Sequence, residues 1–129
     1  MFNLNNKGQS LVLFVILFPI FILVMAMVYD IGNFYYEKER LDNVNYMTIE
    51  YGLDEIENIN ESDLIDLIVR NTSNLSDISV LIDDDVITIR LGINAKGIFS
   101  TILNFDSISI SSEYKGSIIN DEKIIERVK

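Results

Sequence analysis

The chain of 129 residues contains no cysteine, no histidine and no tryptophan, and it has a single proline. Without cysteine there is no disulfide and no thiol nucleophile, and without histidine there is no Ser-His-Asp triad. The usual zinc sites, which depend on these two residue types, are excluded as well. No pairing of a nucleophile with a base, phosphate-binding loop or metal cluster is visible, so the sequence predicts neither an enzyme nor a bound cofactor.

Acidic residues are absent from the first 29 positions. All 20 of them lie from Asp30 onward together with nine of the ten basic residues, so this part of the chain carries a net charge of −11. Nucleic-acid binding depends on Lys and Arg side chains that neutralise phosphates. A domain this acidic is therefore not expected to bind nucleic acid.

The longest apolar segment runs from Leu11 to Tyr29, nineteen residues without a charge. A helix of this length is about 28 Å long, close to the roughly 30 Å hydrocarbon core of a bilayer. A cleaved secretory signal has a shorter apolar region followed by small residues, and no such site follows here. The segment therefore predicts a transmembrane helix over residues 9–30.

The orientation of this helix is not decided by charge. Lys7 precedes the helix, whereas Lys38 and Arg40 follow it among acidic residues. Counting basic residues alone favours a cytoplasmic domain. A short, purely basic tail and a large acidic domain instead suit an inside tail and an extracytoplasmic domain, which is the orientation we expect.

The beginning of the chain, "KGQSLVLF" followed by a proline, resembles the TadE-type minor pilins (pseudopilins) of tight-adherence, or Tad, type IV pilus systems. That family opens with a basic residue, Gly, and Gln-Ala-x-Val-Glu-Phe, and continues with an apolar run that has an early Pro and an Asp-x-Gly near its end. The residues that match this pattern are Lys7, Gly8, Gln9, Val12, Phe14, Pro19 and the "DIG" of Asp30 to Gly32.

The resemblance implies a bacterial cell-adhesion function without catalysis. A prepilin peptidase on the cytoplasmic side would cut the Gly8–Gln9 bond and remove a leader of residues 1–8. The expected partners are the membrane, other pilin subunits and the pilus assembly platform. The expected location is the cell membrane, as a single-pass protein with its C-terminal domain outside, or the pilus itself.

One position departs from the family pattern. The family usually has Glu five residues after the glycine, where its carboxylate pairs with the N-terminal amine of a neighbouring subunit; here that residue is Leu13. Leu13, Phe14 and Pro19 are expected to contribute helix packing only, with a kink at Pro19 because proline cannot bond the carbonyl of Val15. We therefore expect a low-copy component at the pilus tip or in the initiation complex. The alternative is a bitopic binding module or assembly factor that never enters a pilus.

The remaining sequence predicts an α+β fold, with the long N-terminal helix extending into a small domain over residues 31–129. Apolar spacings of three and four continue the helix beyond residue 45. "SDLIDLIVRN" predicts a second helix with Ser62 or Asp63 as its N-cap. Three antiparallel strands are expected near 78–82, 86–93 and 107–114, and the tail "NDEKIIERVK" is expected to be a short helix or frayed.

Two shorter patterns have ordinary structural interpretations. Asp83, Asp84 and Asp85 could supply oxygen ligands to calcium, but they lack the spacing of an EF-hand. Aspartate is common in turns, so we interpret them as the turn of a hairpin. Tyr29 and the "NFYY" that follows it are expected to form an aromatic belt at the membrane interface.

Overall fold

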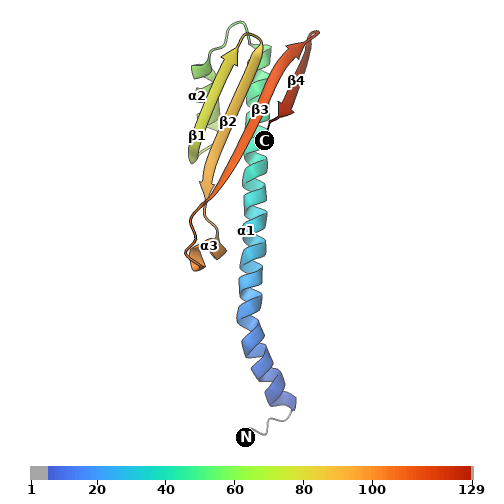
Figure 1. Cartoon of the computed structure of the whole chain (residues 1–129), viewed down its shortest axis with the longest axis vertical. Helices are drawn as coiled ribbons and strands as arrows, with labels where there is room; N and C mark the ends of the chain where they lie inside the picture. The colour runs from blue at the N-terminus through green and yellow to red at the C-terminus, as the bar shows by residue number, and fades with distance from the viewer. Residues whose placement is uncertain (1–5, 129) are drawn as a thin grey trace.

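The computed structural model describes residues 6–128, so residues 1–5 of the expected leader lie outside the described residues. Helix α1, Asn6–Asp54, is one unbroken helix of 49 residues, and it confirms the predicted helix that continues past residue 45. Its lower part extends alone, whereas its upper part lies behind a sheet (Figure 1). The fold is α+β with a long N-terminal apolar helix, as predicted.

The sheet is an antiparallel meander of four strands in the order β1-β2-β3-β4. The strands are β1 Leu75–Asp83, β2 Val86–Ala95, β3 Ile108–Ile119 and β4 Glu122–Arg127. Every strand pairs with the one that precedes it in the chain, and short turns join β1 to β2 and β3 to β4. Asp84 and Asp85 form the β1–β2 turn, which confirms the hairpin expected at the three aspartates.

The prediction of three strands was wrong, because the tail pairs with β3 as a fourth strand. Asn120 and Asp121 both have positive φ angles, 52° and 64°, in the two-residue turn that precedes β4. Two consecutive positive φ angles are typical of the type I′ turn, whose twist matches that of a hairpin. The chain therefore reverses at these two residues, and Ile124 and Ile125 pair with Ser117 and Gly116.

The upper part of α1 packs on one face of the sheet. Beyond Asp30, its buried residues recur at spacings of three and four and so share one side of the helix; they are Leu41, Asp42, Asn45, Thr48, Ile49, Gly52 and Leu53. The facing residues of β2 occupy alternate positions and are Ile87, Ile89, Leu91 and Ile93. No helix of residues 6–128 lies over the opposite face of the sheet (Figure 1).

The helix α2, Glu61–Asn71, lies beside α1 and β1 and completes the core with Leu64 and Ile68. Its N-cap is Asn60, so the expected cap at Ser62 or Asp63 was wrong. The backbone N–H of Asp63 donates to Asn60 Oδ1 at 2.9 Å, and the N–H of Asn60 donates to Asp63 Oδ2 at 3.3 Å. Asp63 thus takes the third position of a capping box instead of the cap itself.

Candidate assembly helix and its junction with the folded domain

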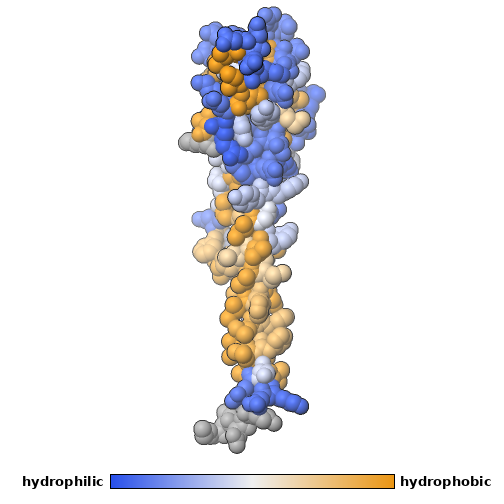
Figure 2. Space-filling view, turned by 90° about the vertical axis from the view of Figure 1, so that its right-hand side faces the viewer, coloured by the Kyte–Doolittle hydropathy of each residue, from blue (hydrophilic) through white to orange (hydrophobic). Residues whose placement is uncertain are grey.

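The lower part of α1, residues 6–29, projects from the domain, and none of these residues is buried. From Leu11 to Tyr29 its side chains are apolar on every side of the helix, and the face shown in Figure 2 is mostly orange there and blue at the polar first turn. Within the described residues, α1 is the one helix that is long and apolar enough to cross a membrane. A helix that is apolar on every side requires surroundings other than water, either lipid or other apolar helices.

The residues expected to act in processing and assembly all lie on this stalk. Gly8 and Gln9 occupy the first turns of α1, where Ser10 Oγ donates to the carbonyl of Asn6 at 2.9 Å. Helix ends fray easily, so a peptide bond at this place unwinds at little cost. The described part of the expected leader, residues 6–8, is helical and continuous with the segment that follows it.

Leu13, Phe14 and Pro19 point away from any cover that the chain itself provides. Leu13 is 56% exposed and Phe14 is 60% exposed. The Phe14 ring packs only beside Phe18, with ring centroids 5.4 Å apart. Pro19 lies inside α1, and the helix bends in its lower, blue part (Figure 1), as is common at proline. The structure thus places these side chains on one accessible helix without bringing them to the folded domain.

The junction between stalk and domain is made by Asp30, which is 4% exposed and is the first buried residue of α1. Its Oδ1 accepts the backbone N–H of Ile98 at 2.8 Å, and its Oδ2 accepts that of Phe99 at 2.7 Å. Ile98 begins α3, Ile98–Ile102, the short helix between β2 and β3. Hydrogen bonds to an ionised carboxylate are stronger than neutral ones. Asp30 therefore fixes the β2–β3 connection to α1.

Gly97 allows this close approach. A Cβ atom at Gly97 would overlap the carboxylate of Asp30. The turn is also closed locally, because Ser100 Oγ accepts the N–H of Gly97 at 2.8 Å. Sequence reasoning used Asp30 as part of a motif but gave it no structural role. The sequence did contain one sign of a structural role, because Asp30 is a single carboxylate directly after nineteen apolar residues.

A second junction joins the middle of α1 to the two central strands through Asn45, whose side chain is fully buried. Its Nδ2 donates to the carbonyl of Ile89 in β2 at 3.0 Å and to that of Ser112 in β3 at 3.2 Å. A buried polar group stabilises a structure only where its hydrogen bonds are formed. The amide therefore favours one register of α1 against the sheet.

Strand β4 is held to α1 by charged side chains. Lys123 Nζ lies 2.8 Å from Asp54 Oδ1, and Arg127 contacts the mostly buried Asp42. The hydrogen bond with Asp54, followed by the negative charges of Asp54 and Glu50, raises the pKa of Lys123 above its ordinary value. The hydrogen bond with the Tyr114 hydroxyl is the main reason that the pKa of Arg127 is also raised.

Between Asn6 and Val128, no group of three or more Asp or Glu side chains is placed to hold a metal ion. The large features of the surface are instead the uncovered stalk and its polar junction with the domain.

Comparisons of the chain with protein-family models, curated proteins and solved structures found no match. The resemblance to TadE-type pilins therefore rests on the residues of the N-terminal segment alone.

Proposed function

We propose that this chain is a TadE-like minor pilin or pilus-assembly subunit. In this proposal the lower half of α1 is inserted in the bacterial cell membrane, and the acidic domain lies on the extracytoplasmic side. The observation that carries the proposal is the single helix α1, whose lower half has no cover from the chain and whose upper half supports the domain without a break.

An uncovered apolar helix suits both states of a pilin. In the membrane its side chains contact lipid, and in a filament the same side chains contact the apolar helices of neighbouring subunits. Neither environment supplies water, so transfer between the two does not expose the stalk. Because Asp30 bonds the β2–β3 connection to α1, the domain moves together with the helix during this transfer.

The role of a minor subunit follows from Leu13. A carboxylate at this position would need a partner, because an unpaired charge in the bilayer costs about 2.5 kcal/mol or more. Leu13 needs none, and its exposed side chain packs equally against lipid or another helix. A subunit at the tip or in the initiation complex has no neighbour above it whose amine must be paired.

A second function is favoured by the same residue. If Leu13 prevents entry into a filament, the chain remains in the membrane as a bitopic binding module or assembly factor. Quantitative proteomics of sheared pili separates the two functions. We expect a small number of copies in the sheared fraction; a chain found only in the membrane supports the second function, and a chain found as the most abundant subunit contradicts both.

Processing is the decisive test of the resemblance. In the producing cell, with its peptidase present, mass spectrometry should find a mature chain that begins at Gln9. Gly8→Val should block the cut, because a side chain there would obstruct the approach of the peptidase to the backbone. Gly32→Val is the matched control, since Gly32 lies in the same helix with open space around it, and this variant should be processed normally.

Two results would contradict this prediction. One is an intact Met1 on the wild-type chain, which would remove the support for a pilin. The other is a cut downstream of residue 25, which would indicate a secretory signal that is separated from the domain.

A further inference from the structure

The connection between β2 and β3 exposes an unusual number of large apolar side chains. It spans residues 96–107 and contains α3, and it leads directly into β3. Five apolar side chains in and beside it are between 44% and 58% exposed: Ile98, Ile102, Leu103, Phe105 and Ile108. A contiguous apolar patch on a folded domain usually marks an interaction surface.

The position of this patch along α1 is fixed. Asp30 binds the backbone of Ile98 and Phe99, and Asp30 directly follows the apolar segment that ends at Tyr29. Because the segment is about as long as a bilayer core is thick, its end lies near the boundary between hydrocarbon and head groups. Figure 1 shows α3 at the end of the sheet nearest the stalk, beside α1.

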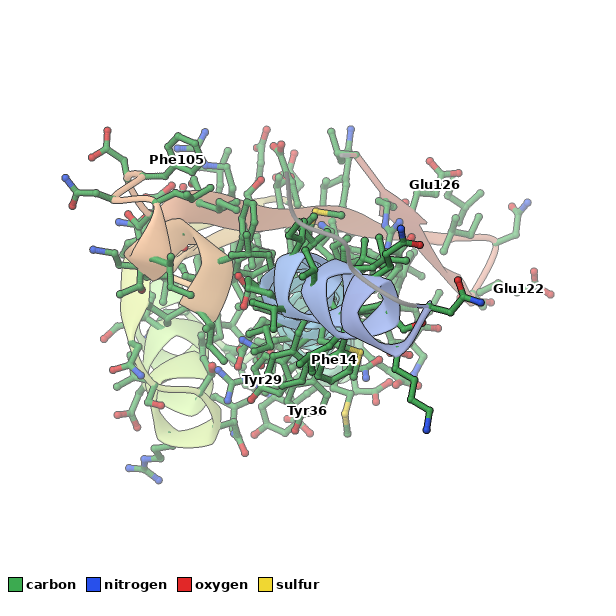
Figure 3. The ribbon with its side chains drawn as sticks, turned by 90° about the horizontal axis from the view of Figure 1, so that it is seen from below. Phe14, Tyr29, Tyr36, Phe105, Glu122 and Glu126 are labelled. Carbon is green, nitrogen blue, oxygen red and sulfur yellow. The ribbon has the colours of Figure 1, made fainter. Side chains whose placement is uncertain are left out.

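The patch is continuous with the apolar surface of the stalk. An apolar groove of about 400 Å³ lies between the two, lined on the α1 side by Met27 and Ile31 and on the other side by Phe105 and Ile108. Viewed from below, Phe105 lies on the connection to one side of α1, whereas Tyr29 lies on the face of α1 turned away from the sheet (Figure 3). Large side chains thus surround the helix at this boundary.

We propose that this patch is a membrane contact: Ile102, Leu103 and Phe105 insert into the head-group region of the phospholipid bilayer next to α1. The inference rests on the proposed membrane insertion of the stalk and adds a second point of attachment. The stalk crosses the bilayer along its normal, and the patch contacts the bilayer surface beside the stalk. Together these two contacts set the depth and the tilt of the domain. Apolar side chains at an interface typically reach roughly 5–10 Å into it.

The charges near the patch agree with a contact that depends on apolar burial. The exposed charges of the connection are Lys96 at its start and Asp106 within it, and these two offset each other. The carboxylate of Asp30 also lines the groove, but it is buried and hydrogen-bonded to the backbone of Ile98 and Phe99. The domain as a whole is strongly acidic and would be repelled by anionic lipids. The contact should therefore form on a neutral phosphatidylcholine bilayer and should not require anionic lipid.

The absence of tryptophan from the chain permits a direct test with single-tryptophan variants. The full chain is reconstituted in phosphatidylcholine vesicles, and fluorescence quenching is measured with lipids brominated near the head group and with aqueous iodide. Phe105→Trp reports on the patch. Leu81→Trp is the matched control, because Leu81 on β1 has the same exposed fraction, 58%, but lies far from the junction along the sheet.

We expect Phe105→Trp to emit at shorter wavelength than Leu81→Trp, with several-fold stronger quenching by brominated lipid and weaker quenching by iodide. Equal quenching of the two variants would overturn the inference. Protection of Phe105→Trp from iodide without quenching by lipid, increasing with the protein-to-lipid ratio, would also overturn it and would indicate that a second copy of the chain covers the patch.

A third variant separates this inference from the proposed function. Phe14→Trp lies within the apolar segment, three residues after its start at Leu11, and should be quenched by lipids brominated along the acyl chain. If it is quenched and Phe105→Trp is not, only the membrane contact of the patch is refuted. If Phe14→Trp is not quenched, the membrane insertion itself is refuted, together with everything that depends on it.

Discussion

The two halves of α1 share one backbone geometry but have opposite surroundings. Residues 6–29 contain no buried residue, whereas residues 30–54 contain eight. From Leu11 to Tyr29 the lower half is apolar on all sides, so no single face is distinguished as the one for a domain to cover. The upper half has one buried stripe that faces the sheet, and its other sides carry charged residues together with exposed tyrosines such as Tyr35 and Tyr36.

This difference shows how one helix can serve two environments. The buried stripe of the upper half fits the sheet in one arrangement only. In this arrangement Asn45 donates to the backbone of β2 and β3, and Gly116 of β3 leaves room for Ile49 of α1. The surface of the lower half has no such feature, and so it accepts lipid or another apolar helix equally. Asp30 stands where one pattern changes to the other, and it is the first side chain of the helix that bonds to the domain.

The largest expected effect comes from truncating matched leucines in the two halves. Leu41 is fully buried, so Leu41→Ala should lower the free energy of unfolding of the domain by about 2–5 kcal/mol, as is usual for a cavity in a core. Leu13→Ala removes the same atoms from the stalk and should leave the free energy of unfolding unchanged. Urea unfolding of the full chain in detergent micelles measures both. A comparable loss in the two variants would show that the halves are not independent.

Glycines provide a second and smaller contrast. At Gly116 in β3 an added Cβ would overlap the methyl group of Ile49, whereas at Gly32 nothing lies within 4 Å. Gly116→Ala should therefore destabilise the domain by about 1–3 kcal/mol through overpacking. Gly32→Ala should not destabilise it, because alanine is the better helix former. The same unfolding measurement decides, and an undiminished stability of Gly116→Ala would mean that α1 can move away from β3 freely.

Several parts of this fold could be predicted from the sequence because their signals are local. The helix continues past the stalk because no proline or glycine pair interrupts residues 33–51. The first two strands were found as β-branched runs on either side of a polar turn, and the third was found because isoleucine and serine alternate in it. Strand β4 was missed because "EKIIER" has two adjacent isoleucines between charges, without alternation. The dipeptide Asn120–Asp121 was the available sign of a hairpin.

The junction could not be predicted, because its partners are distant in the sequence. Asp30 bonds to residues 68 and 69 positions away, and Asn45 to residues 44 and 67 positions away. No spacing or period in one sequence indicates such pairs. The stalk residues Gly8, Gln9 and Phe14 present the reverse case: a sequence pattern singled them out, and the partners that the resemblance implies for them are other molecules.

The smallest expected effect concerns the charged attachment of β4 to α1 and is seen in the dependence of stability on pH. The hydrogen bond with Asp54 raises the pKa of Lys123 above its ordinary value of 10.5, so the folded state holds this proton more tightly than the unfolded state does. The stabilisation is then fully present below pH 10.5 and is lost as the pH rises through the folded pKa above it. The wild-type chain should accordingly lose stability relative to Lys123→Met as the pH increases through this range. Comparing the two chains cancels the titration of every group that they share.

Asp54→Asn removes the acceptor of the hydrogen bond instead of the donor. The wild-type chain should therefore also lose stability relative to Asp54→Asn as the pH rises through this range. Curves for wild type and Lys123→Met that stay parallel across the alkaline range would show that this ion pair does not stabilise the attachment of β4.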